Sequence, residues 1–248
     1  MSYHYVWLLW SAAFLVPWLA MYAVAAGFRR EMLRVSGWTS LLGLTEPIFV
    51  PEYWNPPSLF ELAQRTGFDV ESLIFSFAIG GIGAGLYTVL ARRAPRAVPA
   101  SEQRASRHRF HRLAFAAPVL AFPPLYLLPW NPIYPAITAL LIGGAANVLC
   151  RPDLLRGTVI GGLLFTVLYA LFMALLIAFA PGYIEQVWNL PALSGIHPAG
   201  IPLEELAFGF AFGTYWAGIY EHFTWTRAEP LGAGPAPSPT ARREEPRT

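Results

Sequence analysis

The stretch GIPLEELAFGFAFGTYWAGIY (200–220) decides the fold, because an earlier stretch, GFDVESLIFSFAIGGIGAGLY (67–87), repeats it. Ten of the 21 columns are identical without a gap, and one of these columns holds Glu71 and Glu204. Two apolar helices can agree by composition, but composition alone does not align a glutamate. The two stretches therefore indicate an internal repeat.

A second pair of segments extends the repeat. RREMLR (29–34) resembles RPDLLR (151–156), with arginine, acid, leucine and arginine in step. The chain is therefore predicted to hold two three-helix units, residues 5–90 and 132–223, with a connecting helix at 113–130. Three crossings invert a chain and one more crossing restores it, so the two units are expected to be parallel and to enclose a central cavity.

The composition places these units in a membrane. Hydrophobic residues make up 55% of the 248-residue chain and charged residues only 13%, and several apolar runs approach the roughly 20 residues that a spanning helix needs. The predicted fold is an all-α polytopic membrane bundle, a single domain over residues 1–227. Its seven expected transmembrane helices cover 5–27, 33–50, 70–90, 113–130, 132–149, 157–180 and 203–223.

The arginines predict the orientation of the bundle. The chain has no lysine, and with the N-terminus outside and seven crossings, 16 of the 17 arginines lie on the inner side, with only Arg65 outside. Basic residues collect on the cytoplasmic side of membrane proteins. We therefore expect a multi-pass protein of the cytoplasmic membrane with its N-terminus outside and its C-terminus inside. An interfacial aromatic belt is expected from Trp38, Trp54, Trp130 and Trp188.

Two segments on the predicted inner side lie outside the predicted helices. The arginine-rich loop 92–112 is interpreted as a topology determinant near anionic lipid, in preference to nucleic-acid binding or to a metal site at His108 and His111. The tail 228–248 is rich in proline and small residues, which predicts a disordered cytoplasmic segment. Glycines at helical spacing, such as Gly81 and Gly85, are expected to serve helix packing.

Adjacent glutamates, Glu204 and Glu205, stand where the last predicted helix begins. Pro202 suits a first helical turn and the helix dipole favours acids there, so the pair can be a cap without further role. Adjacent helical residues point about 100° apart, so one acid can satisfy the helix end while the other faces the cavity. A buried carboxyl stays protonated to higher pH. We therefore predict that Glu204 or Glu205 is a general acid, with Glu71 as its partner.

Aromatic side chains follow these acids along the helices. Aromatic faces stabilise cations through the ring quadrupole, so an acid above an aromatic, water-poor cavity suits a carbocation reaction started by protonation of an alkene. Helix packing alone also explains aromatic residues in membrane helices. The expected substrate-binding residues are Phe75, Phe208, Phe212, Tyr215 and Trp216.

PLEE (202–205), followed by an aromatic-rich span, resembles the Pro-x-Glu-Glu/Asp motif of the integral-membrane lycopene cyclases, of both the heterodimeric bacterial and the fused archaeal and fungal types. The two-unit layout resembles the fused form over residues 5–223. The resemblance implies an isomerase of carotenoid biosynthesis, of the intramolecular lyase type, that cyclises the linear end of a polyene without net redox change. It also implies that the motif acids are essential.

The first unit departs from this motif. It reads DVES (69–72), which keeps Glu71 but lacks the proline and the second acid, so Glu46 or Glu52 from the outer segment is the candidate replacement. Alternative functions are a hydratase of terminal alkenes or another isoprenoid cyclase on the same fold. A small-molecule transporter with a 3+1+3 repeat is the alternative of a different class, although the middles of the spans are almost wholly apolar.

The sequence predicts no cofactor and no catalytic metal. The chain has no dinucleotide-binding motif, and its two aspartates do not form the clustered oxygen ligands that bind magnesium diphosphate. The expected partners are a lipid-soluble polyene or isoprenoid substrate and membrane lipid, not nucleic acid. A homo-oligomer and a complex with other carotenoid enzymes both remain open.

Overall fold

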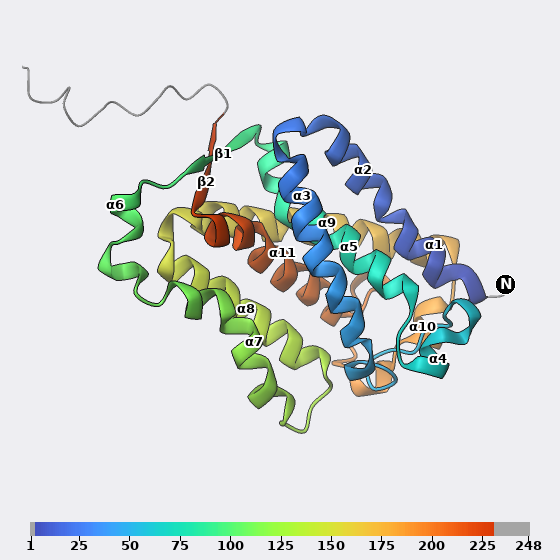
Figure 1. The fold of residues 1–248 in the computed structure, drawn as a ribbon. Helices are drawn as coiled ribbons and strands as arrows, with labels where there is room; N and C mark the ends of the chain where they lie inside the picture. The colour runs from blue at the N-terminus through green and yellow to red at the C-terminus, as the bar shows by residue number, and fades with distance from the viewer. Residues whose placement is uncertain (1–2, 231–248) are drawn as a thin grey trace, which may run out of the picture.

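The computed structural model describes residues 3–230, which are mostly helical (Figure 1). The α-helices are α1 (Val6–Ala13), α2 (Leu15–Val24), α3 (Arg29–Ser40), α4 (Leu62–Thr66), α5 (Val70–Leu90), α6 (Ala100–Gln103), α7 (His111–Tyr126), α8 (Ile133–Cys150), α9 (Leu155–Phe179), α10 (Tyr183–Val187) and α11 (Leu203–Thr224). Short 3₁₀ helices are η1 (Tyr3–Tyr5), η2 (Ala26–Phe28), η3 (Leu41–Ile48), η4 (Leu59–Glu61), η5 (Ser106–His108), η6 (Pro152–Leu154), η7 (Leu190–Ala192) and η8 (Pro198–Gly200).

Four helical segments among the described residues are long and apolar enough to cross a membrane: Tyr3–Val24, Val70–Leu90, Ile133–Cys150 and Pro152–Phe179. This is consistent with a membrane protein. Helices α3 and α7 have only 12 and 16 residues, and α11 is not among the four. The seven crossings, the orientation and the parallel repeat therefore stay predictions.

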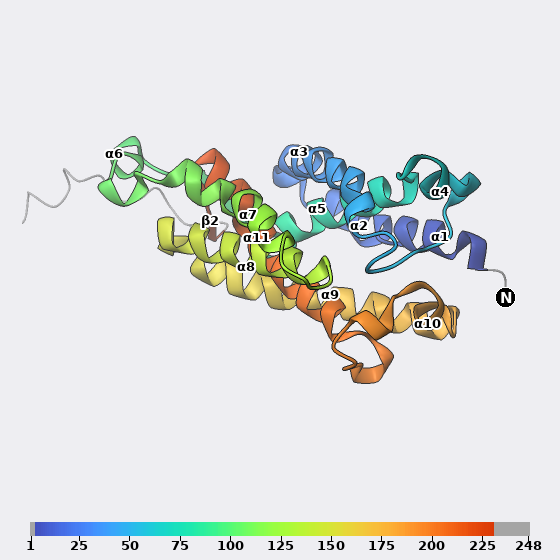
Figure 2. The ribbon, with the colours of Figure 1, turned by 90° about the horizontal axis from the view of Figure 1, so that it is seen from below.

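The helices form two groups that meet at the centre of the bundle. In the first group, α1, α2 and α3 pack against α5; in the second, α8 and α9 pack against α11, and α7 covers α8. Helix α5 contacts both α9 and α11. Seen from below in Figure 2, the body is long, with α1, α4 and α10 at one end and α6 and β2 at the other.

Small residues let these helices approach closely, as the sequence predicts. A Cβ added at Gly81 would lie 2.4 Å from Ser36 Oγ, and one at Gly85 would lie 2.7 Å from Phe28. On α11, a Cβ at Gly213 would lie 3.0 Å from the Cα of Gly162 on α9. Backbones can come this close only where a side chain is missing.

One feature at the end of the bundle where α5 and α11 finish differs from the all-α prediction. Strands β1 (Arg93–Ala97) and β2 (Thr226–Pro230) pair antiparallel, with Ala97 opposite Thr226. The predicted disordered tail begins at Ala228, but Ala228 pairs with Pro95 in this sheet, so the predicted start of the tail is wrong. The rest of that tail, 231–248, lies outside the described residues.

Candidate functional site

Glu205 accepts three hydrogen bonds, more than any other carboxylate among residues 3–230. It lies in the first turn of α11 and is 3% exposed. Trp188 Nε1 (2.6 Å) and the Tyr53 hydroxyl donate to its Oε1, and the Tyr169 hydroxyl donates to its Oε2 at 2.7 Å. These donors come from the loop before α4, from α9 and from the residue after α10. Three distant segments therefore fix one buried carboxylate.

Its neighbour Glu204 has different partners. The Tyr134 hydroxyl of α8 (2.7 Å) and the backbone N–H of Ser194 (2.8 Å) both donate to its Oε1. Pro202, the N-cap of α11, makes no side-chain hydrogen bond. Donors from other segments thus hold Glu204 and Glu205. A helix cap would instead use N–H groups in the first turn of α11.

Glu71, in the first turn of α5, is placed like Glu204. Its Oε1 accepts the backbone N–H of Leu59 at 2.7 Å, from the outer loop that precedes its helix. Glu204 in the same way accepts the N–H of Ser194, from the loop that precedes α11. Each of these two glutamates therefore anchors the loop that precedes its own helix.

Ser72 follows Glu71 and occupies the column of Glu205 in the aligned repeat. Its hydroxyl donates to Glu46 Oε2 at 2.8 Å. Gly43 permits this contact, because a Cβ there would lie 2.7 Å from the backbone of Ser72 and Leu73. The close approach of η3 to α5 therefore carries the carboxyl of Glu46 to the position that follows Glu71.

Asp69 completes the acid cluster of the first half. As the N-cap of α5, it accepts the Ser72 N–H at 2.5 Å through Oδ1, and its Oδ2 accepts from Trp7 Nε1 at 3.2 Å. It lies close enough to Glu46 for the two carboxyl groups to interact. Two carboxyl groups, from residues 46 and 69, thus share one buried site at the start of α5.

Tryptophan rings connect the acid cluster around Asp69 to Glu205. The Trp7 ring meets Trp54 edge-on at 4.6 Å, and Trp54 lies 5.5 Å from Trp188, which donates to Glu205. Trp54 and Trp188 also form an antiparallel β-bridge. Trp188 is only 7% exposed, so its predicted place in an interfacial belt is wrong. It is a buried hydrogen-bond donor.

The aromatic residues predicted from α11 form a continuous row. Phe208 lies 5.9 Å from the Tyr169 ring and 5.7 Å from Phe212, which stacks on Trp216 at 4.2 Å. Tyr215 instead turns toward α7, where its hydroxyl donates to a backbone carbonyl at 2.6 Å. Within the described residues the rings of the row are in mutual contact, so aromatic side chains occupy the line along which the central cavity is expected.

Phe75 joins this row to the first half. Its ring lies 5.5 Å from Trp7, 5.3 Å from Phe14 and 6.4 Å from Tyr169. The structure therefore brings Phe75, Phe208, Phe212 and Trp216 together on the inner side of the acids, while Tyr215 lies at the edge of this group.

Sequence reasoning missed the donors around Glu205, namely Tyr53, Tyr169 and Trp188. A signal for Trp188 was present, and the stretch that matches it directly follows Tyr53. WNPPSL (54–59) and WNLPAL (188–193) agree at four of six positions, and they extend the repeat into the outer loops that pair across the site. Tyr169 carried no such signal, because a tyrosine within an apolar span looks like packing.

Comparison with known proteins connects the second half of the chain to a family. The family model described as lycopene cyclase matches residues 131–223. This segment is nearly the same as the predicted second unit, 132–223, and contains α8, α9, α10 and α11. No curated protein and no solved structure matches the chain. This segment is therefore similar to a lycopene cyclase domain, and the similarity suggests a carotenoid cyclase-like function.

Proposed function

We propose that this chain, whose residues 131–223 match the lycopene cyclase family model, is a membrane enzyme that closes the linear end of a polyene into a ring. The reaction begins when a carboxylic acid protonates the terminal double bond. A second double bond of the same chain attacks the cation and forms the ring bond. The new cation then loses a proton to a carboxylate, so the product is an isomer and no electron acceptor is needed.

Glu205 is the proposed proton donor, and its environment is the observation that carries the proposal. Burial in apolar surroundings penalises a charged carboxylate, and we take the neutral acid as the form from which the reaction starts. When it gives up its proton, Tyr53, Tyr169 and Trp188 are already placed to stabilise the carboxylate that forms. Donors fixed before the reaction lower the barrier because they need no reorganisation while charge develops.

The rings next to Glu205 are proposed to shelter the cation. Tyr169, Phe208, Phe212 and Trp216 lie in sequence from the acid into the bundle, and aromatic faces attract cations while excluding water. A polyene must part these rings to enter, because they contact one another. Their apolar character selects a lipid-soluble substrate over a sugar or an ion.

The remaining acids divide into two proposed roles. Glu46, held by Ser72, is the second acid, because it shares its buried site with Asp69 and lies beside the residue that aligns with Glu205. One proton shared between two adjacent carboxyl groups avoids the repulsion of two charges. Glu71 and Glu204 anchor the outer loops and position the site, but do not transfer the proton.

Expression in a bacterium that accumulates lycopene tests the proposal, with pigments separated by chromatography. Wild-type protein should convert lycopene to a product of the same mass with a ring, and Glu205→Gln should leave lycopene unconverted at equal amounts of membrane protein. The matched control is Glu52→Gln, an exposed glutamate of the same outer region, which should keep full conversion. Unchanged lycopene with wild-type protein, or full conversion by Glu205→Gln, contradicts the proposal.

A further inference from the structure

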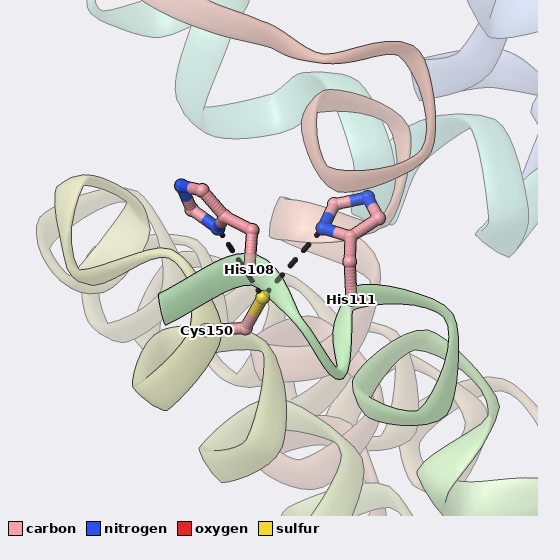
Figure 3. A group of neighbouring side chains, drawn as sticks. All are labelled: His108, His111 and Cys150. Carbon is pink, nitrogen blue, oxygen red and sulfur yellow. Dashed lines mark hydrogen bonds between the residues drawn. The ribbon is translucent and has the colours of Figure 1, made fainter. Parts of the chain in front are cut away.

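Three metal-binding side chains meet at the end of the bundle opposite the acids. His108 ends η5, His111 begins α7 and Cys150 ends α8, and Figure 3 shows both imidazole rings directed at the sulfur. Cys150 Sγ lies 3.6 Å from Nδ1 of each histidine. Taken together, the three ligand atoms lie within 4.8 Å of one another. No role in the proposed cyclisation uses them.

These distances suit a zinc ion. With Zn–S of about 2.3 Å and Zn–N of about 2.05 Å, a tetrahedral site separates sulfur from nitrogen by about 3.6 Å. Both S···N distances already have this value. The two imidazole nitrogens need only close to the roughly 3.4 Å expected for a tetrahedral edge. Thiolate and imidazole ligands are also the combination that zinc prefers over hard cations.

Neighbouring charges both oppose and favour a cation at this site. Arg107 and Arg151 oppose a divalent cation near His108, while Glu102 and Asp153 favour it. Arg107 Nε also donates to His108 Nε2 at 3.1 Å, and this contact must break when Nδ1 binds a metal, because the proton then sits on Nε2. Loss of the thiol proton of Cys150 offsets one of the two positive charges of zinc.

Aromatic neighbours hold the rings in place. The His111 ring is stacked between His222 at 3.9 Å and Trp225 at 3.8 Å, and Trp225 also meets His108 edge-on at 5.0 Å. His222 Nε2 pairs with the backbone carbonyl of His111 at 3.1 Å. Rings fixed in this way lose little freedom when a metal binds.

The proposed site borders a pocket. His108 and His111 line a pocket of ≈ 430 Å³ together with Trp225 and residues 109, 110, 112 and 113. Sites with three protein ligands keep a fourth position for water, whereas structural sites with four ligands are closed. A water or a small anion can therefore complete the tetrahedron from this pocket.

We propose that His108, His111 and Cys150 bind one Zn²⁺ ion, which ties the start of α7 to the end of α8. The ion is remote from the proposed chemistry. His222, stacked on His111, lies 17 residues after Glu205 on α11, which is about 25 Å at 1.5 Å per residue. The site is therefore too far from Glu205 to take part in proton transfer, and its effect is expected on the stability of the end of the bundle where α7 begins and α8 ends.

Zinc titration of the full chain tests this proposal. Protein purified in detergent without a histidine tag and stripped with a chelator should bind one Zn²⁺ and gain thermal stability. Cys150→Ser, His108→Ala and His111→Ala should each weaken binding by more than the roughly 10–100-fold that loss of an outer-shell partner costs. The matched control is His197→Ala, an exposed histidine at the other end of the bundle, which should bind as wild type does. Wild-type protein that takes up no zinc, or Cys150→Ser protein with unchanged affinity, overturns the proposal.

Cobalt provides a second measurement that does not depend on the folding of a variant. Co²⁺-loaded wild-type protein should show an intense sulfur-to-cobalt charge-transfer absorption together with the visible bands of a tetrahedral ion. Cobalt bound without the sulfur band means that Cys150 is not a ligand and contradicts the proposed site.

Discussion

The two halves of the chain hold one acid in the same way and a second acid in different ways. Glu71 and Glu204 each accept a backbone N–H from the loop before their helix. The next residue in the second half is Glu205, a carboxylate with three donors. In the first half the next residue is Ser72, whose hydroxyl donates to Glu46, a residue of η3.

This difference separates a structural requirement from a chemical one. An acid at the aligned position fixes the outer loop, and both halves retain it. The residue that follows differs between the halves: one half carries its second acid on the helix, and the other receives it from η3. Among the described residues, Glu205 accepts three hydrogen bonds that can stabilise its conjugate base, whereas Ser72 donates one to Glu46. We therefore expect the halves to be unequal in catalysis and similar in the way they anchor their loops.

The largest effect is expected from Glu205→Gln, which removes the transferable proton and keeps the size of the side chain. General acid catalysis contributes roughly 10²–10⁴-fold, and the rate in detergent or vesicles should fall by about this factor. The rate of Glu46→Gln should fall by about 10²-fold or less, because one hydroxyl, that of Ser72, donates to Glu46, against three donors to Glu205. Rates are compared per folded protein. A larger loss of rate for Glu46→Gln than for Glu205→Gln would contradict the proposal that the second half supplies the proton donor.

Tyr169→Phe tests the donors around Glu205. The change removes one hydrogen bond to the carboxylate and leaves the ring. A hydrogen bond to a charged group contributes about 1.5–3 kcal/mol, which corresponds to about 10–100-fold in rate. Turnover should fall by this factor while the melting temperature changes little. Tyr215→Phe is the control, because its hydroxyl bonds a backbone carbonyl on α7. Equal rates for the two variants would show that the hydroxyl of Tyr169 has no special role.

Gly43→Ala tests the close packing of η3 on α5, which belongs to the first half of the chain. The added methyl would meet the backbone of Ser72 and Leu73 at 2.7 Å, and such overpacking costs about 1–3 kcal/mol. The melting temperature should fall, and the residual activity should resemble that of Glu46→Gln, because Glu46 moves away from Ser72. Gly37→Ala is the control, since nothing lies within 4 Å of its added methyl. Unchanged stability in Gly43→Ala would refute the close approach of η3 and α5.

The smallest effects are expected from Glu71→Gln and Glu204→Gln. The amide oxygen of glutamine still accepts the loop N–H, so each change should cost about 1 kcal/mol of stability and leave turnover within a few-fold of wild type. Chemical denaturation and single-turnover rates measure the two quantities separately. A loss of rate as large as that of Glu205→Gln would make the altered residue part of the proton transfer.

Much of the helical layout follows from sequence pattern. Apolar runs place the long helices, because burying an apolar surface is what these segments have in common, and small residues such as Gly81 and Gly213 mark where helices touch. The β1–β2 pair was not predicted, because RAPRA and TRAEP lack the alternating apolar pattern by which strands are recognised. Their pairing depends on the ends of α5 and α11 lying side by side.

The site was predicted in part. The repeat singled out Glu71 and Glu204, the motif added Glu205, and the missing second acid of the first unit suggested Glu46. The different tasks of these acids could not be predicted, since a carboxylate's role depends on the donors that reach it from other segments. Tyr53, Tyr169 and Trp188 are distant in sequence and resemble ordinary packing residues. The proposed zinc ligands were set aside for the same reason, because Cys150 joins His108 and His111 only in the folded chain.

Reaction in D₂O tests the central claim most directly. If a carboxylic acid starts the cyclisation, its exchangeable proton becomes deuterium before it is delivered to the terminal alkene. Mass spectrometry should find one deuterium for each ring formed, at the ring carbon that began as the protonated alkene carbon, and Glu205→Gln should form almost no labelled product. A ring formed in D₂O without deuterium would mean that the reaction does not begin with protonation by an exchangeable acid, and would contradict the role proposed for Glu205.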